Sequence, residues 1–285
     1  MNKQNSVLVF IAAAFVALSS CNSPKADSDT NQTVDSIATS VVDTTPINEV
    51  ANYKFSYAIA NVPSPLEILD EFAQSELPVY TNFLNPVENV DNYQSSLKQT
   101  FNYGIYGVDL GYLVVNNRTI DMLKYYSASK KLAEQLNMGE TFNKFITRFE
   151  SNADNKDSLK RVVDEAFSAT DSYLRSNERL IIASQILAGS WLEAQHITVN
   201  TLKDVERTAA NEKLFVRVFE QRFYLDNISK VLEEFKSDPA LNTIKKDFDS
   251  LLAIYKEPKE AKDINKEFLT KLAASLDKVR ANIIK

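Results

Sequence analysis

A narrow polar stripe runs along an otherwise apolar helical segment near the middle of the chain, and it holds the residues best suited to acid and base chemistry. The segment spans 178–202, and its centre is the most apolar helical stretch beyond the first 20 residues. Glu193 and His196, three residues apart, could act together as an acid and a base. At about 100° per residue the polar side chains fall within an arc of roughly 80°; they are Glu178, Gln185, Gly189, Glu193, His196 and Asn200.

Three interpretations of this stripe stay open. We expect the first, in which the stripe is the solvent-facing side of a helix whose other sides are buried in a bundle. It can also be a buried network of hydrogen-bonded side chains. The third interpretation is the lining of a pocket for catalysis or for a ligand, which the close approach allowed by Gly189 would favour.

The composition excludes most other kinds of catalytic or metal site. The chain has one His and one Cys, so a second Glu-x-x-His pair for a di-iron bundle is missing. A multi-histidine or Cys-x-x-Cys metal site and an internal disulfide are excluded for the same reason. No Gly-x-Ser-x-Gly elbow occurs, which argues against a serine hydrolase triad built on His196. We therefore expect no catalytic residue, no metal and no cofactor.

A second candidate site surrounds Asp109, in a segment that holds three of the five glycines of the chain. Glycine within a helix costs up to about 1 kcal/mol relative to alanine, so three within eight residues require a reason. Close helix packing through Gly107 and Gly111, one turn apart, is the expected reason. The alternative is a small-molecule pocket beside Asp109, whose carboxylate would be satisfied by the hydroxyl of Tyr106 or Tyr112 or by a cationic group of the ligand.

The elements that position both candidates are predicted to be helices. A chain of 285 residues with 5 glycines, where about 20 would be usual, cannot supply the turns of a β-sandwich, a propeller or a Rossmann domain. We expect an all-α fold, either a multi-helix bundle or a helical-hairpin array of about eight or nine helices. Periodicity and capping signals predict helices near 65–75, 92–115, 119–137, 141–151, 156–175, 178–202, 214–235, 239–255 and 264–283.

Two domains and several finer features follow from this pattern. Residues 53–205 are expected to form a helical core domain, and residues 206–285 a three-helix segment packed on it. Gly139 is expected to be the left-handed cap of a helix, and a short extended segment could begin at Tyr53. Aromatic side chains at helical spacing are expected in the core: Phe142, Phe145, Phe149, Phe215, Phe219 and Phe223.

The first 21 residues resemble the leader and lipobox of bacterial lipoproteins. Lys3 precedes an apolar run of about a dozen residues, which is the layout of a secretory signal and too short to span a membrane. The run ends in Leu18-Ser19-Ser20-Cys21. The resemblance implies removal of residues 1–20 and lipid modification of Cys21, and an ordinary signal peptide with an incidental cysteine is the alternative. Asn22, which is not the Asp that often marks inner-membrane retention, favours the outer membrane.

The segment after the lipobox is expected to be a disordered tether. Residues 21–50 are rich in Ser, Thr, Asn, Asp and Gln, and no aromatic residue occurs before Tyr53, so they have too little apolar area to offset chain ordering. About 30 flexible residues reach roughly 30 Å. Without Lys3 the remaining 31 basic side chains face 38 acidic ones, a net charge of −7. This charge argues against nucleic acid as a partner and against electrostatic membrane binding.

Two further resemblances concern the helical part. The segment 106–126 contains Gly107, Gly111, Asp121 and a tyrosine pair, and it resembles one degenerate tetratricopeptide hairpin with no second copy 34 residues later. The chain after the tether resembles the uncharacterised helical lipoproteins of Bacteroidota, which implies a cell-envelope location and no particular activity.

These observations predict a lipid-anchored helical protein of the cell envelope that binds a protein partner or a small ligand and has no catalytic activity. Its contact with the membrane would be the lipid on Cys21. The alternative is an envelope enzyme with hydrolase-like acid and base chemistry at Glu193 and His196, in a pocket between helices.

Overall fold

The computed structural model describes residue 56 and residues 65–285 except residue 153. The leader, Cys21, the tether and the segment near Tyr53 lie outside the described residues. The all-α prediction is confirmed, because the described part contains ten α-helices, three short 3-10 turns and no strand. The α-helices are α2 (Pro65–Gln74), α3 (Ser96–Val115), α4 (Thr119–Gln135), α5 (Gly139–Asn143), α6 (Ile146–Ser151), α7 (Lys156–Ser176), α8 (Leu180–Leu202), α9 (Glu212–Glu233), α10 (Pro239–Tyr255) and α11 (Lys266–Ile284).

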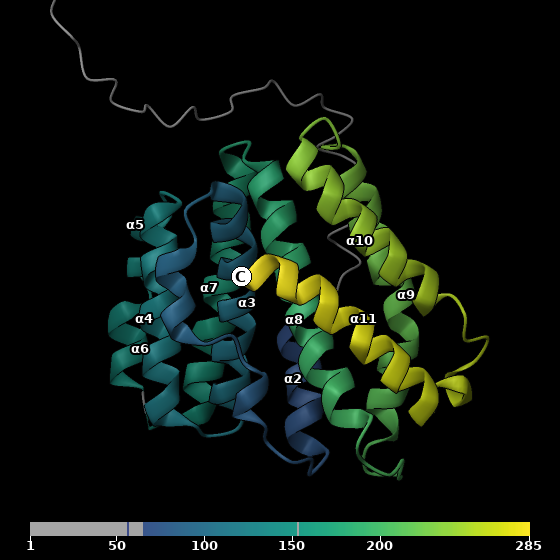
Figure 1. Cartoon of the computed structure of the whole chain (residues 1–285). Helices are drawn as coiled ribbons and strands as arrows, with labels where there is room; N and C mark the ends of the chain where they lie inside the picture. Colours follow the sequence, from purple (N-terminus) through teal and green to yellow (C-terminus); the bar gives the residue numbers. More distant parts are fainter. Residues whose placement is uncertain (1–55, 57–64, 153) are drawn as a thin grey trace, which may run out of the picture. The chain divides into compact units, whose positions relative to one another are not determined.

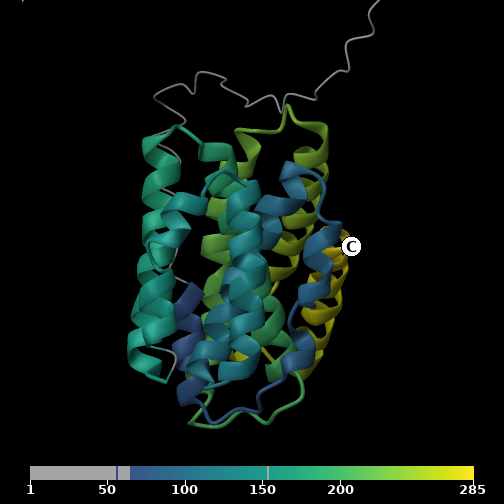
Figure 2. The ribbon, with the colours of Figure 1, turned by 90° about the vertical axis from the view of Figure 1, so that its left-hand side faces the viewer.

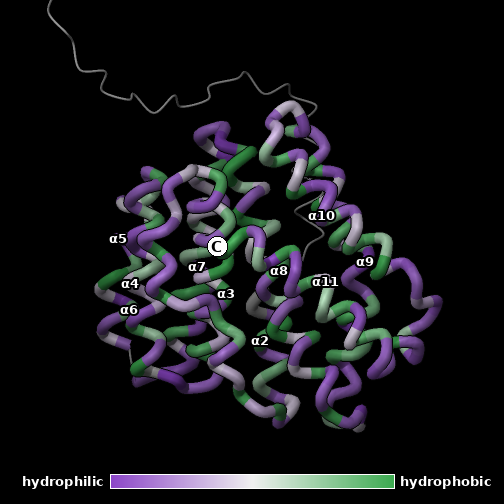
Figure 3. Tube along the Cα trace, viewed as in Figure 1, coloured by the Kyte–Doolittle hydropathy of each residue, from purple (hydrophilic) through white to green (hydrophobic). Residues whose placement is uncertain are grey.

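Helices α3 and α8 form the centre of this fold and pack against each other along much of their length (Figure 1). Most residues of both helices are buried on every side. Helices α4 and α7 cover α3, whereas α9 and α11 cover α8. Figure 2 shows that the axes of most long helices are roughly aligned. Helix α11 crosses α8 obliquely in Figure 1. In Figure 3 apolar and polar residues alternate along the outer helices, as expected for helices with one buried face.

The close contact of α3 with α8 depends on two glycines. A Cβ atom added to Gly104 would lie 2.2 Å from the carbonyl oxygen of Ile186, and one added to Gly189 would lie 2.2 Å from that of Phe101. Both distances are far below van der Waals contact, so only glycine permits this approach. Close helix packing is therefore confirmed as a role of glycine, but at Gly104 and Gly189 and not at the expected pair of Gly107 and Gly111. Gly107 faces a phenylalanine ring of α7.

Residues other than glycine provide the left-handed ends of the helices. Asn117, Asn137 and Glu178 have φ values of 55° or 56°, and no glycine among the described residues has a positive φ. At each of these three ends, the N–H of the next residue donates a hydrogen bond to the carbonyl five residues before it, as in a Schellman motif. The expected role of Gly139 was wrong, since Asn137 takes that conformation and Gly139 begins α5. The three bonds join Arg118 to Leu113, Met138 to Ala133 and Arg179 to Leu174.

Two other expectations need correction. The helix expected at 141–151 is divided into α5 and α6, so the described residues contain more helices than the eight or nine expected. Phe142, Phe149 and Phe215 are buried as expected, but Phe223 is 58% exposed. Helix α10 packs against α9 and α11, and α11 also packs against α8. Among the helices described, none combines the length and the apolar character needed to cross a bilayer.

Candidate functional site

One face of α3 fixes the backbone of the segment that precedes it. Three side chains one turn apart, Tyr106, Asp109 and Tyr112, each bond to a different backbone group in 80–86. Neither hydroxyl bonds to Asp109, so the alternative in which Tyr106 or Tyr112 satisfies that carboxylate is wrong. The bonds join the Tyr106 hydroxyl to the Pro86 carbonyl (2.8 Å), the Asn85 N–H to Asp109 Oδ2 (3.1 Å) and the Tyr80 N–H to the Tyr112 hydroxyl (3.0 Å).

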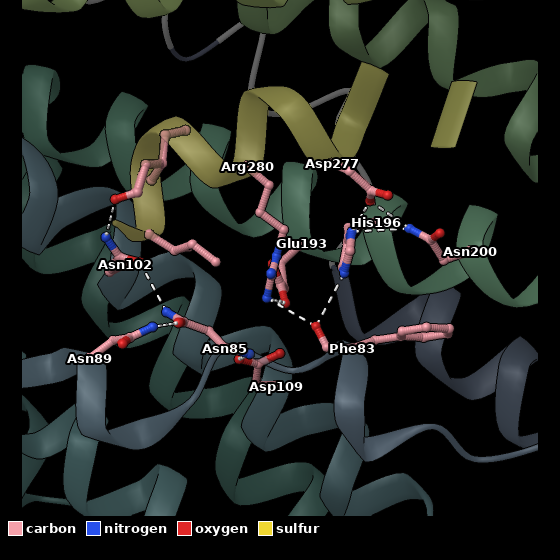
Figure 4. A network of polar contacts seen from close by, with 12 residues as sticks. Phe83, Asn85, Asn89, Asn102, Asp109, Glu193, His196, Asn200, Asp277 and Arg280 are labelled. Atoms are coloured by element: carbon pink, nitrogen blue, oxygen red, sulfur yellow. Dashed lines mark hydrogen bonds and ion pairs between the residues drawn. The ribbon is translucent and has the colours of Figure 1, made fainter. Parts of the chain in front are cut away.

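A buried ion pair lies next to this segment. Glu193 on α8 has no exposed surface, and its two carboxylate oxygens accept bonds from Nε and Nη2 of Arg280 on α11, at 2.5 and 2.6 Å. Arg280 Nη2 also donates to the carbonyl oxygen of Phe83, at 3.0 Å. The guanidinium thus connects α11, α8 and the 80–86 segment, as Figure 4 shows. The bidentate geometry is the arrangement that makes a buried pair favourable.

Asp109 contributes a second carboxyl beside this pair. Its side chain is fully buried and lies within hydrogen-bonding reach of Glu193. Burial and the nearby charge of Glu193 raise the pKa of Asp109 well above its usual value, and the opposing effect of Arg280 is smaller. Asp109 Oδ1 has no donor among the described residues, as expected if this atom carries a proton. A neutral Asp109 can use that proton to donate a hydrogen bond to the Glu193 carboxylate. The cluster then holds one negative charge, on Glu193, and one positive charge, on Arg280.

His196 belongs to a neighbouring part of the same network. Its Nε2 atom lies 3.1 Å from the carbonyl oxygen of Phe83, and its Nδ1 atom lies 2.9 Å from Asp277 Oδ1. Asn200 Nδ2 also lies 3.1 Å from Nδ1 and donates to Asp277 Oδ1, so both side chains meet the same carboxylate. Burial opposes ionisation of Asp277, but bonds from His196 and Asn200 outweigh it and hold the pKa of Asp277 below its usual value. The single carbonyl of Phe83 is therefore a neighbour of both Arg280 and His196 (Figure 4).

The polar stripe of α8 is therefore a buried network, and its expected role as a solvent-facing side was wrong. All members from Gln185 to Asn200 are buried, whereas Glu178 precedes the helix and is exposed. Gln185 accepts a bond from Thr100 on α3, at 2.5 Å, and Gly189 meets α3 directly. Glu193, His196 and Asn200 bond to α11. The stripe therefore changes partner along its length, from α3 at Gln185 and Gly189 to α11 at its later residues.

The same network holds the end of α11. The last carbonyls of a helix have no partner within it, and here side chains from α3 and the segment before it supply donors. Asn102 donates to the carbonyl of Ile283 at 3.1 Å, and the Tyr93 hydroxyl donates to that of Ile284 at 3.3 Å. Asn85, which is fully buried, bonds to both of these side chains (2.9 and 3.1 Å).

Sequence reasoning did not find the residues of α11, and one signal was available. Arg280 lies seven residues after Ala273 and four after Leu276, both buried on the inner face of α11. A positive charge at such a position indicates a buried partner. Asp277 shows no such signal, because its carboxylate is half-exposed. Asn85 and Asn102 could not be found, because their bonds depend on how distant segments come together.

The arrangement provides structural support and no free acid or base. Glu193 bonds to Arg280 and not to His196, so the acid and base of the enzyme alternative do not bond to each other. Within the described part of the chain, no three His, Cys, Asp or Glu side chains are grouped as they would be around a metal ion. The charge of Glu193 is matched by that of Arg280, and Asp277 bonds to His196 and Asn200. Comparison with protein-family models, with curated proteins and with solved structures gave no match, so the functional argument rests on this geometry.

Proposed function

We propose that this protein is a lipid-anchored, non-catalytic binding module of the bacterial cell envelope. The sequence supports the anchor through the lipobox that ends at Cys21. The network of α3, α8 and α11 supports a non-catalytic role, because Glu193 and His196 are both engaged in bonds that hold helices together. An enzyme using these two groups would have to break those bonds before either could transfer a proton to a substrate.

The observation that carries the binding proposal is a groove beside α9. It has a volume of about 850 Å³ and lies between α9 and the residues that follow α10. Phe223, 58% exposed, lies in this groove, and the guanidinium of Arg222 stacks on two rings, 3.4 Å from the centre of Phe219 and 4.6 Å from that of Phe223. Exposed aromatic and arginine side chains are the types that contribute most energy at protein interfaces.

The charge of the groove favours an acidic partner. Four basic side chains line it against one carboxylate, that of Asp226, so the lining carries a net charge of +3. Asp226 already pairs with Lys230 at 2.6 Å and with Lys256 at 2.8 Å. Arg222 and Lys259 remain available to an incoming carboxylate. The chain as a whole has a net charge of −6, so the groove is opposite in sign to the protein. Its positive charge would attract and orient a partner with an acidic segment.

The anchor is tested by replacing Cys21 with Ala. We expect the variant to leave the membrane fraction, because the acyl chains and not surface charge would hold the protein there. Ser23→Ala, a variant that leaves the lipobox and its cysteine unchanged, serves as the control for effects on export. A Cys21→Ala protein that stays in the membrane pellet after a high-salt wash would refute the anchor.

The groove is tested by placing a photo-crosslinking amino acid at position 223 in cells. The same amino acid at Ile120 on α4, which is 80% exposed, is the matched control. We expect a discrete adduct from position 223 that is absent from position 120 and is lost when Arg222 is changed to Glu. The same adducts from both positions, or an adduct that Arg222→Glu leaves unchanged, would argue against this groove.

A further inference from the structure

The groove beside α9 contains two polar side chains that have no partner. The hydroxyl of Tyr224 and the amide of Asn227 both line it, are half-buried, and make no hydrogen bond with the described residues. Asn227 lies one turn after Phe223 on α9, so these two side chains are neighbours on the same face of the helix. A side-chain amide both donates and accepts hydrogen bonds, as a peptide group does. The amide of Asn227 is therefore suited to the backbone of a polypeptide.

The four cations of the groove are not equally available to a ligand. Asp226 bonds to Lys230 and Lys256, at 2.6 and 2.8 Å, and these bonds hold the pKa of its carboxyl below the ordinary value. Asp226 is therefore charged at neutral pH and faces both ammonium groups. Arg222 and Lys259 make no ion pair with the described residues. A ligand thus meets two free cations and two that already share a carboxylate.

This division of charge distinguishes two kinds of acidic ligand. A polyanion, such as polyphosphate or an acidic polysaccharide, carries a charge on every repeat and gains most where all cations are free. In this groove it would also come close to the carboxylate of Asp226, a like charge that opposes binding. A polypeptide segment with a few carboxylates can place them on Arg222 and Lys259 alone. It can also cover the ring of Phe223, which is 58% exposed.

We propose that the groove recognises an acidic polypeptide segment through Arg222 and Asn227, and that Asp226 excludes polyanions from it. This inference rests on the proposed binding role of the groove and names the chemistry of its partner. The carboxylates of the segment bond to the free cations, an apolar side chain packs on Phe223, and a peptide group pairs with the amide of Asn227. Asp226 determines specificity, because it keeps two of the four cations occupied.

The segment is tested by fluorescence anisotropy with a labelled peptide and the purified full-length protein in an uncharged detergent. The probe has the sequence Glu-Phe-Glu-Ala-Glu, and the comparison peptide has glutamine in place of each glutamate. We expect saturable binding of the acidic probe and binding of the glutamine peptide that is weaker by about tenfold or more.

Three variants locate this binding in the groove. Arg222→Glu should weaken the acidic probe by about tenfold or more. Lys278→Glu, which makes the same change of charge at an exposed position of α11, should leave the affinity close to that of the natural protein. Asn227→Leu removes the amide and keeps a side chain of similar size, and we expect binding to weaken by about fivefold or more, since the amide makes two bonds to a peptide group. Circular dichroism checks the folding of each variant.

Competition by long-chain polyphosphate tests the role of Asp226. On the natural protein polyphosphate should displace the peptide poorly. Asp226→Asn releases Lys230 and Lys256, and we expect it to improve displacement by polyphosphate by about tenfold or more, with a smaller gain in peptide affinity.

Four outcomes would overturn the proposal: no saturable binding of the acidic peptide, equal binding of the glutamine peptide, an Asn227→Leu protein that binds as tightly as the natural one, or polyphosphate that displaces the peptide equally well with and without Asp226. The adduct at position 223 in cells separates this inference from the binding role itself. An adduct without peptide binding would refute the acidic segment alone, whereas the absence of both would refute the groove as a binding site.

Discussion

Glu193 and Arg280 form a bidentate ion pair across 87 residues of sequence, and neither side chain has more than a tenth of its surface exposed. The pair joins the central helix α8 to the last helix α11. Because the Arg280 guanidinium also bonds to the Phe83 carbonyl, the segment before α3 is fixed by the same contact. Three parts of the chain that are distant in sequence therefore depend on one pair of charges.

Breaking this pair should destabilise the fold strongly. Glu193→Gln removes the bidentate counter-ion of the buried guanidinium, and we expect a loss of about 3–5 kcal/mol in the free energy of unfolding, measured by urea denaturation. Glu212→Gln is a matched control, because it removes a carboxylate that pairs with Arg207 nearer the surface. That control should cost no more than about 1 kcal/mol. Equal losses in the two variants would show that burial of the Glu193 pair is unimportant.

The neighbouring carboxyl should respond in the opposite way. Asp109→Asn replaces a neutral acid by an amide of the same shape, which can still donate to Glu193 and accept the Asn85 N–H. The natural Asp109 has a folded pKa above its unfolded value, so its stabilising contribution is full below about pH 4 and is lost as pH rises toward the folded pKa. Relative to the natural protein, Asp109→Asn should therefore gain stability as pH rises, by up to about 1.4 kcal/mol per pH unit in that range.

Urea denaturation of both proteins from pH 4 to pH 8 measures this effect. The two free energies of unfolding should be similar at pH 4 and should diverge above it, with the variant the more stable. Parallel curves would mean that Asp109 does not hold a proton in the folded state. Glu193→Gln measured over the same range separates the two carboxyls, because its loss comes from the ion pair and should persist at neutral pH.

How far the sequence predicts this structure depends on whether a feature is local. Helix positions followed from periodicity and from caps such as Asp238 before Pro239, because those signals lie within one helix. The partners of Glu193 did not, because they come from elements far away in the sequence. A polar stripe on a helix has the same spacing whether it meets water or another polar surface. Only the charge of Arg280 on the inner face of α11 indicated that the stripe meets another polar surface and not water.

The crossing of α3 and α8 should not tolerate a single added methyl group. Gly104→Ala and Gly189→Ala would each place a Cβ atom 2.2 Å from a backbone carbonyl oxygen of the other helix, and backbone cannot move aside as a flexible side chain can. We expect each variant to lose about 3 kcal/mol or more. Gly139→Ala is the control, because its nearest neighbour is the Glu134 side chain at 3.2 Å. It should be close to neutral, and thermal denaturation of the three variants measures the difference.

Glu178 should be a position where glycine stabilises the protein. This residue has φ 56° after the end of α7, a conformation that costs an L-residue roughly 1–2 kcal/mol. Its side chain is exposed, so Glu178→Gly removes the strain without removing packing. Glycine also loses more chain entropy on folding, which offsets part of the relieved strain. We expect a net gain of about 0.5–1 kcal/mol in the free energy of unfolding, measured by thermal or urea denaturation. Asn137→Gly should gain less, because asparagine tolerates this conformation better than glutamate does. A larger gain at Asn137 than at Glu178 would contradict backbone strain as the cause.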